Sequence, residues 1–328
     1  MRVVTLEEHC ASPGFLRGPG RMLVQQAQVV NSAASKMLDA LCDVGEKRIA
    51  AMDAAGIDMQ VLSLTWPGTE QLGAEDAVGV AIEANDFMAA AVRRFPKRFA
   101  AFAALPMADP VAAVAELDRR VTQDGFKGAL INGHVGERYL DDPFFSPVLE
   151  RAEALGVPIY LHPTKSPAAV QDTWFKGFRP EVSELLSGGA WGWHIETALH
   201  VVRLMAGGVF DRYPNLQIIV GHLGESLSFM LLREHLDSLL TPDKTGLERP
   251  FSRYLRENVH YTFSGFNILP AFLNLLLEVG VDRMMFSVDY PNSSMQEARQ
   301  FLNHLPVSPL DRQKIAYENA TRLLALSI

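Results

Sequence analysis

The feature that most constrains the fold is a regular alternation of short apolar runs and amphipathic stretches along almost the whole chain. Eight runs have the length and content of buried strands: they cover residues 3–6, 59–64, 99–104, 128–131, 157–161, 216–220, 259–262 and 284–288. These runs are continuously apolar, which is typical of parallel strands that are covered on both faces. Helical patterns separate most of them and end at breakers such as Gly56, Pro96 and Gly156.

This alternation predicts an α/β fold, a (β/α)8 TIM barrel. A doubly wound open sheet is the alternative, but no strand is followed by G-x-G-x-x-G, so the usual dinucleotide signature is absent and we expect no organic cofactor. No linker or low-complexity tract divides the 328 residues. We therefore predict one domain over residues 1–328, with long inserted loops at about 11–45 and 164–195.

Composition excludes several classes of partner. The chain is 48% hydrophobic and 21% charged, which is ordinary for a soluble globular protein. Its net charge of −8 and lack of a basic run argue against nucleic acid and against an anionic membrane. No apolar run approaches a bilayer span, and no signal-peptide pattern opens the chain. With only two cysteines, Cys10 and Cys42, we expect a reducing, cytoplasmic setting.

The active site of a TIM barrel lies at the carboxyl ends of its strands, so the residues that follow each predicted strand are the candidates. They carry many polar and aromatic side chains: Glu7, His9, Thr65, Trp66, Asn132, His162, His222, Glu225, Ser264, Asp289, Tyr290 and Asn292. Of the nine histidines, three fall at these strand ends. Nine histidines placed at random along the chain would seldom put three at predicted strand ends.

Four of these residues have the chemistry of metal ligands. Strand side chains alternate between faces, so Glu7 and His9 point the same way. With His162 and Asp289 they form a mixed nitrogen and oxygen set suited to one divalent ion, Zn²⁺ or Mn²⁺. Taken singly, His162 could cap a strand end, His222 could bond to backbone, and Asp289 could form a turn. Their joint placement at equivalent barrel positions favours a functional site.

Several motifs carry a specific resemblance that covers nearly the whole chain. They are LEEH at 6–9, LSLTWPG at 62–68, GALING at 128–133, YLHP at 160–163, ETALHVVRLMAGGVFDRYPNLQIIVGHLGE at 196–225 and MFSVDYP at 285–291. With these motifs the chain resembles the mononuclear amidohydrolase-superfamily group that includes aminocarboxymuconate-semialdehyde decarboxylase and the γ-resorcylate and 2,3-dihydroxybenzoate decarboxylases.

The resemblance implies roles for individual residues. It matches the metal ligands to Glu7, His9, His162 and Asp289. It also implies that His222 is the catalytic strand-six histidine, that Glu225 is its carboxylate partner, and that Arg233 helps to fix the pair. Glu7 replaces the first histidine of the H-x-H that the family's hydrolases often carry, which is the form seen in the aromatic-acid decarboxylases. Asn292 departs from the resorcylate-type enzymes, which tend to have an aromatic residue there.

These observations favour metal-dependent, non-oxidative decarboxylation of a small ortho-hydroxy aromatic or related unsaturated carboxylic acid. Asp289 is then expected to move a proton from the phenol to the ring carbon, and His222 with Glu225 to bind the carboxylate or to donate the proton instead. We expect the ring pocket to be shaped by Trp66, Asn132, Tyr290 and Asn292. The alternative is a hydrolase of a lactone or ester, or a C=C hydratase, that uses a metal-bound hydroxide at the same ligands.

A last expectation concerns assembly. The second inserted loop is rich in aromatic residues between 174 and 193. Aromatic side chains are enriched at protein interfaces. We therefore expect this segment to form either a lid over the pocket or a subunit contact, and we favour a homo-dimer or homo-tetramer, with a small carboxylic acid as the substrate.

Overall fold

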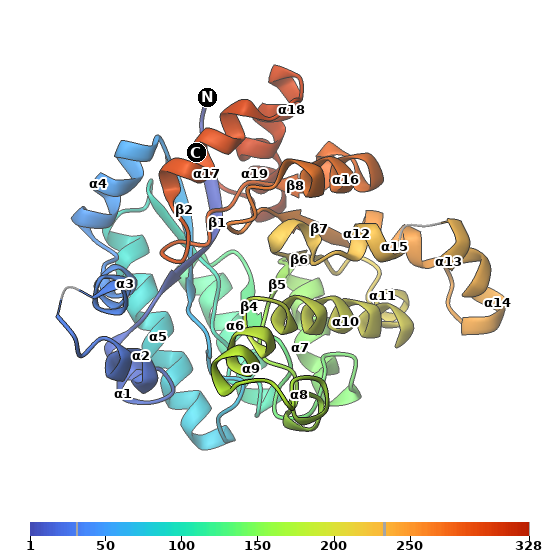
Figure 1. Ribbon diagram of the computed structural model, residues 1–328, viewed down its shortest axis with the longest axis horizontal. Helices are drawn as coiled ribbons and strands as arrows, with labels where there is room; N and C mark the ends of the chain where they lie inside the picture. Colours follow the sequence, from blue (N-terminus) through green and yellow to red (C-terminus); the bar gives the residue numbers. More distant parts are fainter. Residues whose placement is uncertain (31, 232–233, 328) are drawn as a thin grey trace.

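The computed structural model describes residues 1–30, 32–231 and 234–327, and it contains the predicted barrel. In these ranges eight parallel strands occur where they were predicted: β1 (Val4–Cys10), β2 (Met59–Leu64), β3 (Phe99–Ala101), β4 (Ala129–Asn132), β5 (Ile159–His162), β6 (Ile218–Val220), β7 (Val259–Thr262) and β8 (Met284–Met285). They pair in the orders β1-β2-β3 and β4-β5-β6-β7-β8. Single bridges, Ala103 to Ala129 and Leu6 to Ser287, join the two sheets and close the ring (Figure 1).

Helices surround the strands. Those outside the two inserted loops are α4 (Glu46–Ala55), α5 (Ala74–Arg94), α6 (Pro110–Asp124), α7 (Ser146–Leu155), α10 (Gly192–Ala206), α11 (Val209–Arg212), α12 (Leu227–Leu231), α13 (Glu234–Leu239), α14 (Pro242–Thr245), α15 (Phe251–Glu257), α16 (Leu269–Val279), α17 (Met295–His304), α18 (Pro309–Gln313) and α19 (Asn319–Leu324). Short helical turns are η1 (Pro143–Phe145), η2 (His222–Gly224), η3 (Val281–Arg283) and η4 (Lys314–Glu318). The last of these is a π-helical turn that joins α18 to α19.

Two apolar layers hold the barrel together. The interior is filled by side chains such as Val4, Val61, Phe102 and Tyr160, all of them buried. A larger cluster fills the space between the outer faces of the strands and the helices, as expected for strands covered on both faces. The barrel is therefore a packed core, and its functional surface has to lie at its ends.

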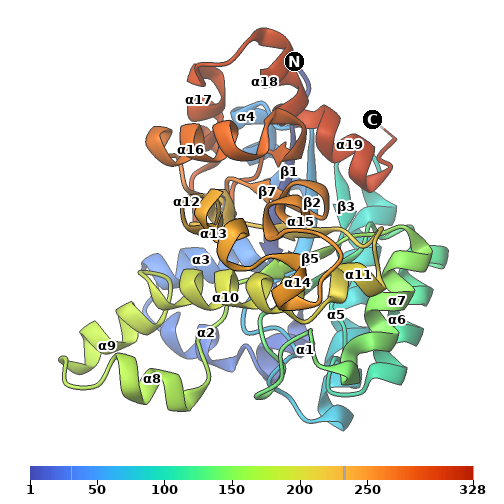
Figure 2. The same cartoon turned by 90° about the vertical axis from the view of Figure 1, so that its right-hand side faces the viewer.

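Both predicted inserted loops contain helices. Residues 11–45 include α1 (Pro13–Arg17), α2 (Arg21–Gln26) and α3 (Ala33–Cys42). Residues 164–195 include α8 (Ala168–Trp174), α9 (Pro180–Ser187) and the start of α10. Figure 2 shows α8 and α9 projecting from the body of the barrel. None of the helices in the described ranges is both long and apolar enough to cross a lipid bilayer.

Candidate metal centre and active-site cavity

Strand β1 brings two of the predicted ligands to the carboxyl end of the barrel. Val4 and Leu6 both belong to the interior cluster, so strict alternation would place Glu8 inside and Glu7 outside. A register shift between Thr5 and Glu8, with Glu7 at φ 61°, breaks this alternation. Such a bulge re-aims the side chains that follow it. As a result Glu7 points inward together with His9.

The structure brings all four predicted metal ligands together. His162 Nε2 lies 3.4 Å from Glu7 Oε1, and His9 Nε2 lies 3.2 Å from Asp289 Oδ1. The rings of His9 and His162 meet edge to face with their centroids 4.8 Å apart. Glu7, His9 and His162 each present a ligand atom within 4.8 Å of the others. Strands β1 and β5 and the segment after β8 therefore contribute to one small cluster.

The hydrogen bonds of Glu7, His9 and His162 engage the side-chain atoms that face away from the cluster. His9 Nδ1 lies 3.2 Å from Ser63 Oγ, and His162 Nδ1 lies 2.8 Å from the Pro163 carbonyl oxygen. The other carboxylate oxygen of Glu7 accepts hydrogen bonds from the hydroxyls of Tyr160 and Ser264. Glu7 Oε1 and His9 Nε2 are buried and have no hydrogen-bond partner. Buried polar atoms are normally paired, so these two atoms fit a divalent cation bound between them.

The charges of the cluster support the same conclusion. Burial raises the pKa of Glu7, although the nearby His222 opposes the shift. Burial also lowers the pKa of His162 well below its usual value, and the neighbouring His9 and His222 add to the effect. His162 therefore stays neutral, which is the form that binds a metal. A cation at this position would stabilise the Glu7 carboxylate that burial disfavours.

A second polar group lies beside the ligands. His222 begins the turn η2 after β6, and this turn has left-handed backbone at His222, Leu223 and Glu225. His222 Nδ1 lies 2.7 Å from Glu225 Oε1, and its Nε2 lies 4.0 Å from Glu7 Oε1. The other Glu225 oxygen lies 2.6 Å from Nδ1 of His194, a residue of α10. One carboxylate therefore holds two imidazoles.

The carboxylates determine the protonation of His222. Burial by itself would lower the pKa of His222, but Glu225 and then Glu7 outweigh it and raise the pKa to about 10. Burial likewise opposes ionisation of Glu225, yet His222 and the hydrogen bond from His194 lower its pKa below the usual value. At neutral pH the group thus consists of a cationic His222 and an anionic Glu225. A cationic imidazole next to the ligand cluster can bind a carboxylate.

These residues open into a cavity of about 430 Å³. Its lining consists of His9, Leu23, Met37, Leu41, Thr65, Trp66, His162, Gly189, Trp193, His194, His222, Ser264, Gly265, Phe266, Asp289, Asn292 and Ser293. Trp66 packs against Trp193 at 5.3 Å between ring centroids, and its Nε1 donates to Thr164 Oγ1 at 3.1 Å. Both inserted loops therefore contribute apolar walls to a cavity whose floor is polar. Its size suits a single aromatic ring with small substituents.

The predicted pocket residues divide into two groups. Trp66 and Asn292 line the cavity, and Asn292 Nδ2 donates to Asp289 Oδ1 at 2.9 Å. Asn132 is buried outside the lining, where its backbone N–H donates to Glu70 Oε1 at 2.9 Å. The ring of Tyr290 turns away from the cavity and packs under the Arg48 guanidinium, 4.6 Å from it. Arg233 lies outside the described residues.

Sequence reasoning missed His194, and it placed Trp193 only within an aromatic segment that could be a pocket lid or a subunit contact. Both lie at the start of α10, within the second inserted loop. The only signal was the W-G-W-H segment itself, which places a histidine among aromatic residues directly before the ETALH motif. Ser264 was noted only as a strand-end residue, whereas its hydroxyl contacts Glu7.

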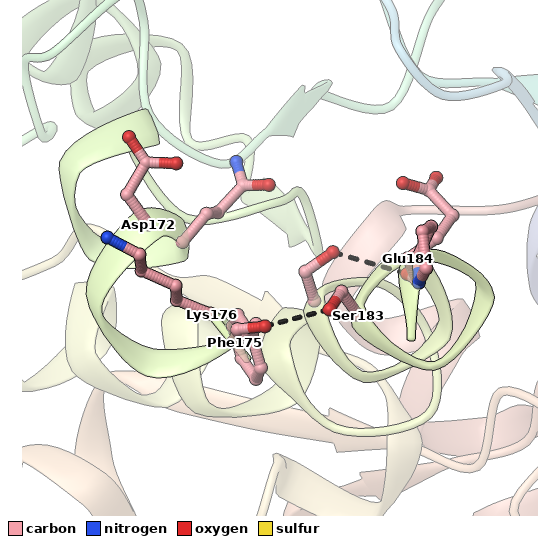
Figure 3. Close-up of a pocket in the computed structure, with 8 residues that line it drawn as sticks. Asp172, Phe175, Lys176, Ser183 and Glu184 are labelled. Carbon is pink, nitrogen blue, oxygen red and sulfur yellow. Dashed lines mark hydrogen bonds between the residues drawn. The ribbon is translucent and has the colours of Figure 1, made fainter. Parts of the chain in front are cut away.

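A separate hollow lies between α8 and α9, away from the ligand cluster. It measures about 540 Å³ and is lined by Asp172, Phe175, Lys176, Ser183 and Glu184 among others (Figure 3). The bonds drawn there are local, such as the one from Ser183 Oγ to the Phe175 carbonyl oxygen at 2.8 Å. None of its lining residues belongs to the ligand cluster or to the His194–Glu225–His222 group. We therefore assign the chemistry to the cavity at the strand ends.

Comparisons with known proteins find a family and several relatives. Residues 33–326 match the amidohydrolase family model. The chain is 37% identical to a γ-resorcylate decarboxylase of Rhizobium radiobacter, with 98% of each chain covered. It superposes on the crystal structure of a 2,6-dihydroxybenzoate decarboxylase from Rhizobium with a TM-score of 0.89 and 37% identity over 99% of each chain. A dihydroxybenzoic acid decarboxylase from Polaromonas, solved with manganese and 2-nitroresorcinol, gives a TM-score of 0.85 and 34% identity over 99% of this chain and 97% of that one.

Proposed function

The chain belongs to the amidohydrolase family, and we propose that it is a metal-dependent, non-oxidative decarboxylase of an ortho-hydroxy aromatic carboxylic acid. The observation that carries the proposal is the cluster of Glu7, His9, His162 and Asp289, with two unpartnered ligand atoms, at the floor of a cavity of one-ring size. The reactions named for its relatives support this choice over hydrolysis.

We further propose that the ion is Mn²⁺. The atoms that would hold it are Glu7 Oε1, His9 Nε2, His162 Nε2 and Asp289 Oδ1. Two carboxylates and two imidazoles form a hard, mixed set that accepts Mn²⁺ as well as Zn²⁺. The manganese found in the Polaromonas relative supports Mn²⁺. When bound, the ion supplies positive charge that holds the substrate's carboxylate and ortho oxygen in one orientation.

The chain's own residues would move the proton. Loss of CO₂ leaves the bonding electron pair on the ring carbon, so that carbon must gain a proton as the C–C bond breaks. Asp289 faces the cavity beside His9 and is placed to take the phenol proton and pass it to this carbon. The electron pair of the broken C–C bond takes up this proton, CO₂ leaves, and the phenol oxygen becomes a phenolate, so atoms and charge balance and no oxidant is needed. Asn292 would orient Asp289 through its hydrogen bond to Oδ1.

The His222–Glu225 pair would bind the substrate carboxylate. Glu225 keeps Nδ1 of His222 engaged, which leaves Nε2 directed toward Glu7 and the cavity. His194 would act through Glu225, because it holds the second oxygen of that carboxylate. Trp66 and Trp193 would cover the ring and exclude water.

Turnover of a metal-stripped and reloaded enzyme tests the proposal. Mn²⁺ or Zn²⁺ is restored separately, and the protein is offered ortho-hydroxybenzoates in one series and aryl lactones and esters in another. We expect metal-dependent CO₂ release from the first series, with a loss of roughly 10²-fold or more in kcat for Asp289→Asn. Acid release from the second series without CO₂ from the first would replace decarboxylation by hydrolysis. Near-normal CO₂ release by Asp289→Asn would remove the proton role.

We also propose that the protein is a homo-dimer or homo-tetramer. The projecting α8–α9 region exposes Trp174, Phe178, Leu185 and Trp191, each with half or more of its surface accessible. An apolar patch of this kind typically marks a protein interface. Light scattering should give a multiple of 36.2 kDa. The variant Trp174→Glu with Leu185→Glu should lower that mass, and a monomeric wild type at working concentration would contradict the proposal.

The cellular setting is the last part of the proposal. Cys10 and Cys42 are both free thiols, which supports a reducing compartment, and we propose the cytoplasm. The expected partner is the small carboxylic acid substrate. Cofractionation of the activity with a cytoplasmic marker enzyme checks the location.

The assignment of residues 1–328 to one domain remains a prediction.

A further inference from the structure

The barrel is weakly paired at the point where two metal ligands meet. Strand β8 has only two residues, Met284–Met285, and one bridge, from Leu6 to Ser287, joins β1 to the segment that follows β8. Beyond that bridge, the backbone N–H of His9 donates to the Tyr290 carbonyl oxygen at 2.7 Å. The ligands His9 and Asp289 lie at this seam. Their spacing therefore depends on whatever else holds β1 to the segment after β8.

Side chains on the outer face of the seam supply that connection. Glu8, which points away from the metal ligands, accepts a hydrogen bond from the Val288 backbone N–H at 3.0 Å and one from Gln60 Nε2 at 2.8 Å. Gln60 in turn accepts a hydrogen bond from Arg48 Nε at 2.7 Å. A buried chain of polar groups thus runs from α4 through β2 and β1 to the residue directly before Asp289.

Arg48 is the centre of this group. Its side chain is fully buried, and one terminal nitrogen donates to the His9 carbonyl oxygen at 2.7 Å. Its guanidinium carbon, Cζ, lies 4.6 Å from the centroid of the Tyr290 ring, and Tyr290 directly follows Asp289. Arg48 therefore contacts the backbone of one ligand and the neighbour of another. Arg48 does not line the cavity and is not a member of the ligand cluster, so it is not placed to touch the substrate.

We propose that Arg48 is a positioning residue that sets the spacing of the ligands His9 and Asp289 across the seam. The proposal rests on the metal site proposed above. A buried guanidinium is expensive to desolvate, and its planar donors fix the directions of the groups they bind. Outer partners of this kind hold metal ligands in place, and their loss typically weakens metal affinity about 10- to 100-fold.

Mn²⁺ binding by the metal-free protein tests the proposal. The electron paramagnetic resonance signal of free Mn²⁺ gives the dissociation constant without any turnover. We expect Arg48→Met to raise that constant about 10- to 100-fold. Arg48→Lys keeps the charge and one donor for the His9 carbonyl, so its constant should lie between those of the wild type and Arg48→Met. If Arg48→Met does not fold, Arg48→Lys carries the comparison.

Arg120 offers a matched control. It is equally buried, but its bonds run to Glu116, Asp124 and Asp86 on the outer helices α5 and α6. Arg120→Met should therefore lower the melting temperature and leave Mn²⁺ binding unchanged. An unchanged constant for the Arg48 variants, or an equal rise for Arg120→Met, would overturn the positioning role. Failure of the wild type itself to bind Mn²⁺ would instead overturn the metal site.

Discussion

At the scale of single residues, the site depends on a glycine, Gly221, which has no side chain. A Cβ placed on Gly221 would lie 2.6 Å from Glu7 Oε2 and 2.9 Å from Ser264 Oγ. The backbone there, at φ −78°, is open to any residue, so glycine is needed for space alone. The first ligand thus fits because the residue after β6 has no side chain.

This contact yields a first prediction. In Gly221→Ala the new methyl group should displace the Glu7 carboxylate and weaken Mn²⁺ binding by about 10-fold or more, measured by the same resonance titration. Gly79→Ala is the control, because nothing lies within 4 Å of the Cβ it would add in the exposed face of α5. That change should stabilise the helix by roughly 0.5–1 kcal/mol and leave binding unaffected. Equal binding by both variants would contradict the steric argument.

A second prediction follows from the raised pKa of His222. A histidine whose pKa is about 10 when folded, against about 6.5 when unfolded, stabilises the fold fully below pH 6.5. That contribution declines as the pH rises and is lost beyond about 10. Urea unfolding of the metal-free protein should therefore show the advantage of wild type over His222→Gln shrinking between pH 6.5 and 10.

His260 provides the comparison for this experiment. Burial lowers the pKa of His260 to about 3, so it stays neutral in the folded protein at every pH above neutrality. The difference between wild type and His260→Gln should therefore be constant from pH 7.5 to 10. A parallel decline in both series would show that His222 is not the group responsible.

At the scale of elements, the strands were predictable and their local irregularities were not. All eight apolar runs became strands because continuous burial leaves a clear pattern. The bulge at Glu7 has no such pattern, yet it decides that Glu7 and not Glu8 points toward His162. The left-handed turn at Asp289 similarly sends the Tyr290 ring toward Arg48, away from the predicted pocket. The sequence did not indicate that His194 belongs to the site. Its position depends on the two helices, α8 and α9, that lie between it and β5 in the chain.

The inserted helices carry a third prediction. Trp193, at the start of α10, covers the cavity by packing on Trp66. Trp193→Ala should remove that wall and raise KM for a hydroxybenzoate by about 10-fold, since a lost aromatic contact is worth roughly 1 kcal/mol or more. Mn²⁺ affinity should change less than KM, because Trp193 offers no ligand atom and meets the proposed ligand His162 only through an edge contact of the rings, 6.3 Å between centroids. Trp193→Phe keeps an aromatic wall, so its KM should lie close to the wild-type value. An unchanged KM in Trp193→Ala would exclude the covering role.

At the scale of the whole molecule, the ligand set joins parts of the barrel that are distant in sequence. Glu7 and His9 come from β1, His162 from β5, and Asp289 from the segment after β8. An ion held by all four binds the folded state and not the unfolded chain. Ligands of this kind stabilise by mass action, by about 2.7 kcal/mol when the free ion is 100-fold above its dissociation constant.

The fourth prediction is therefore a thermal one. Removing the metal with a chelator should lower the melting temperature of the wild type by a few degrees, and added Mn²⁺ should restore it. Glu7→Gln has the same shape but loses the charged ligand, so its melting temperature should respond much less to either treatment. If neither the chelator nor added Mn²⁺ changed the melting temperature of the wild type, the proposal that these residues bind an ion would be contradicted.

The closure of the barrel between β1 and β8 also has a consequence for biosynthesis. On the ribosome, Glu7 and His9 emerge long before Asp289, and the ring that brings them together cannot close until β8 has been made. A nascent chain therefore cannot assemble the complete ion site, however early its first strands form. If the proposed ion site is right, capture of the ion, and with it the first turnover, must wait until translation has passed the last strand.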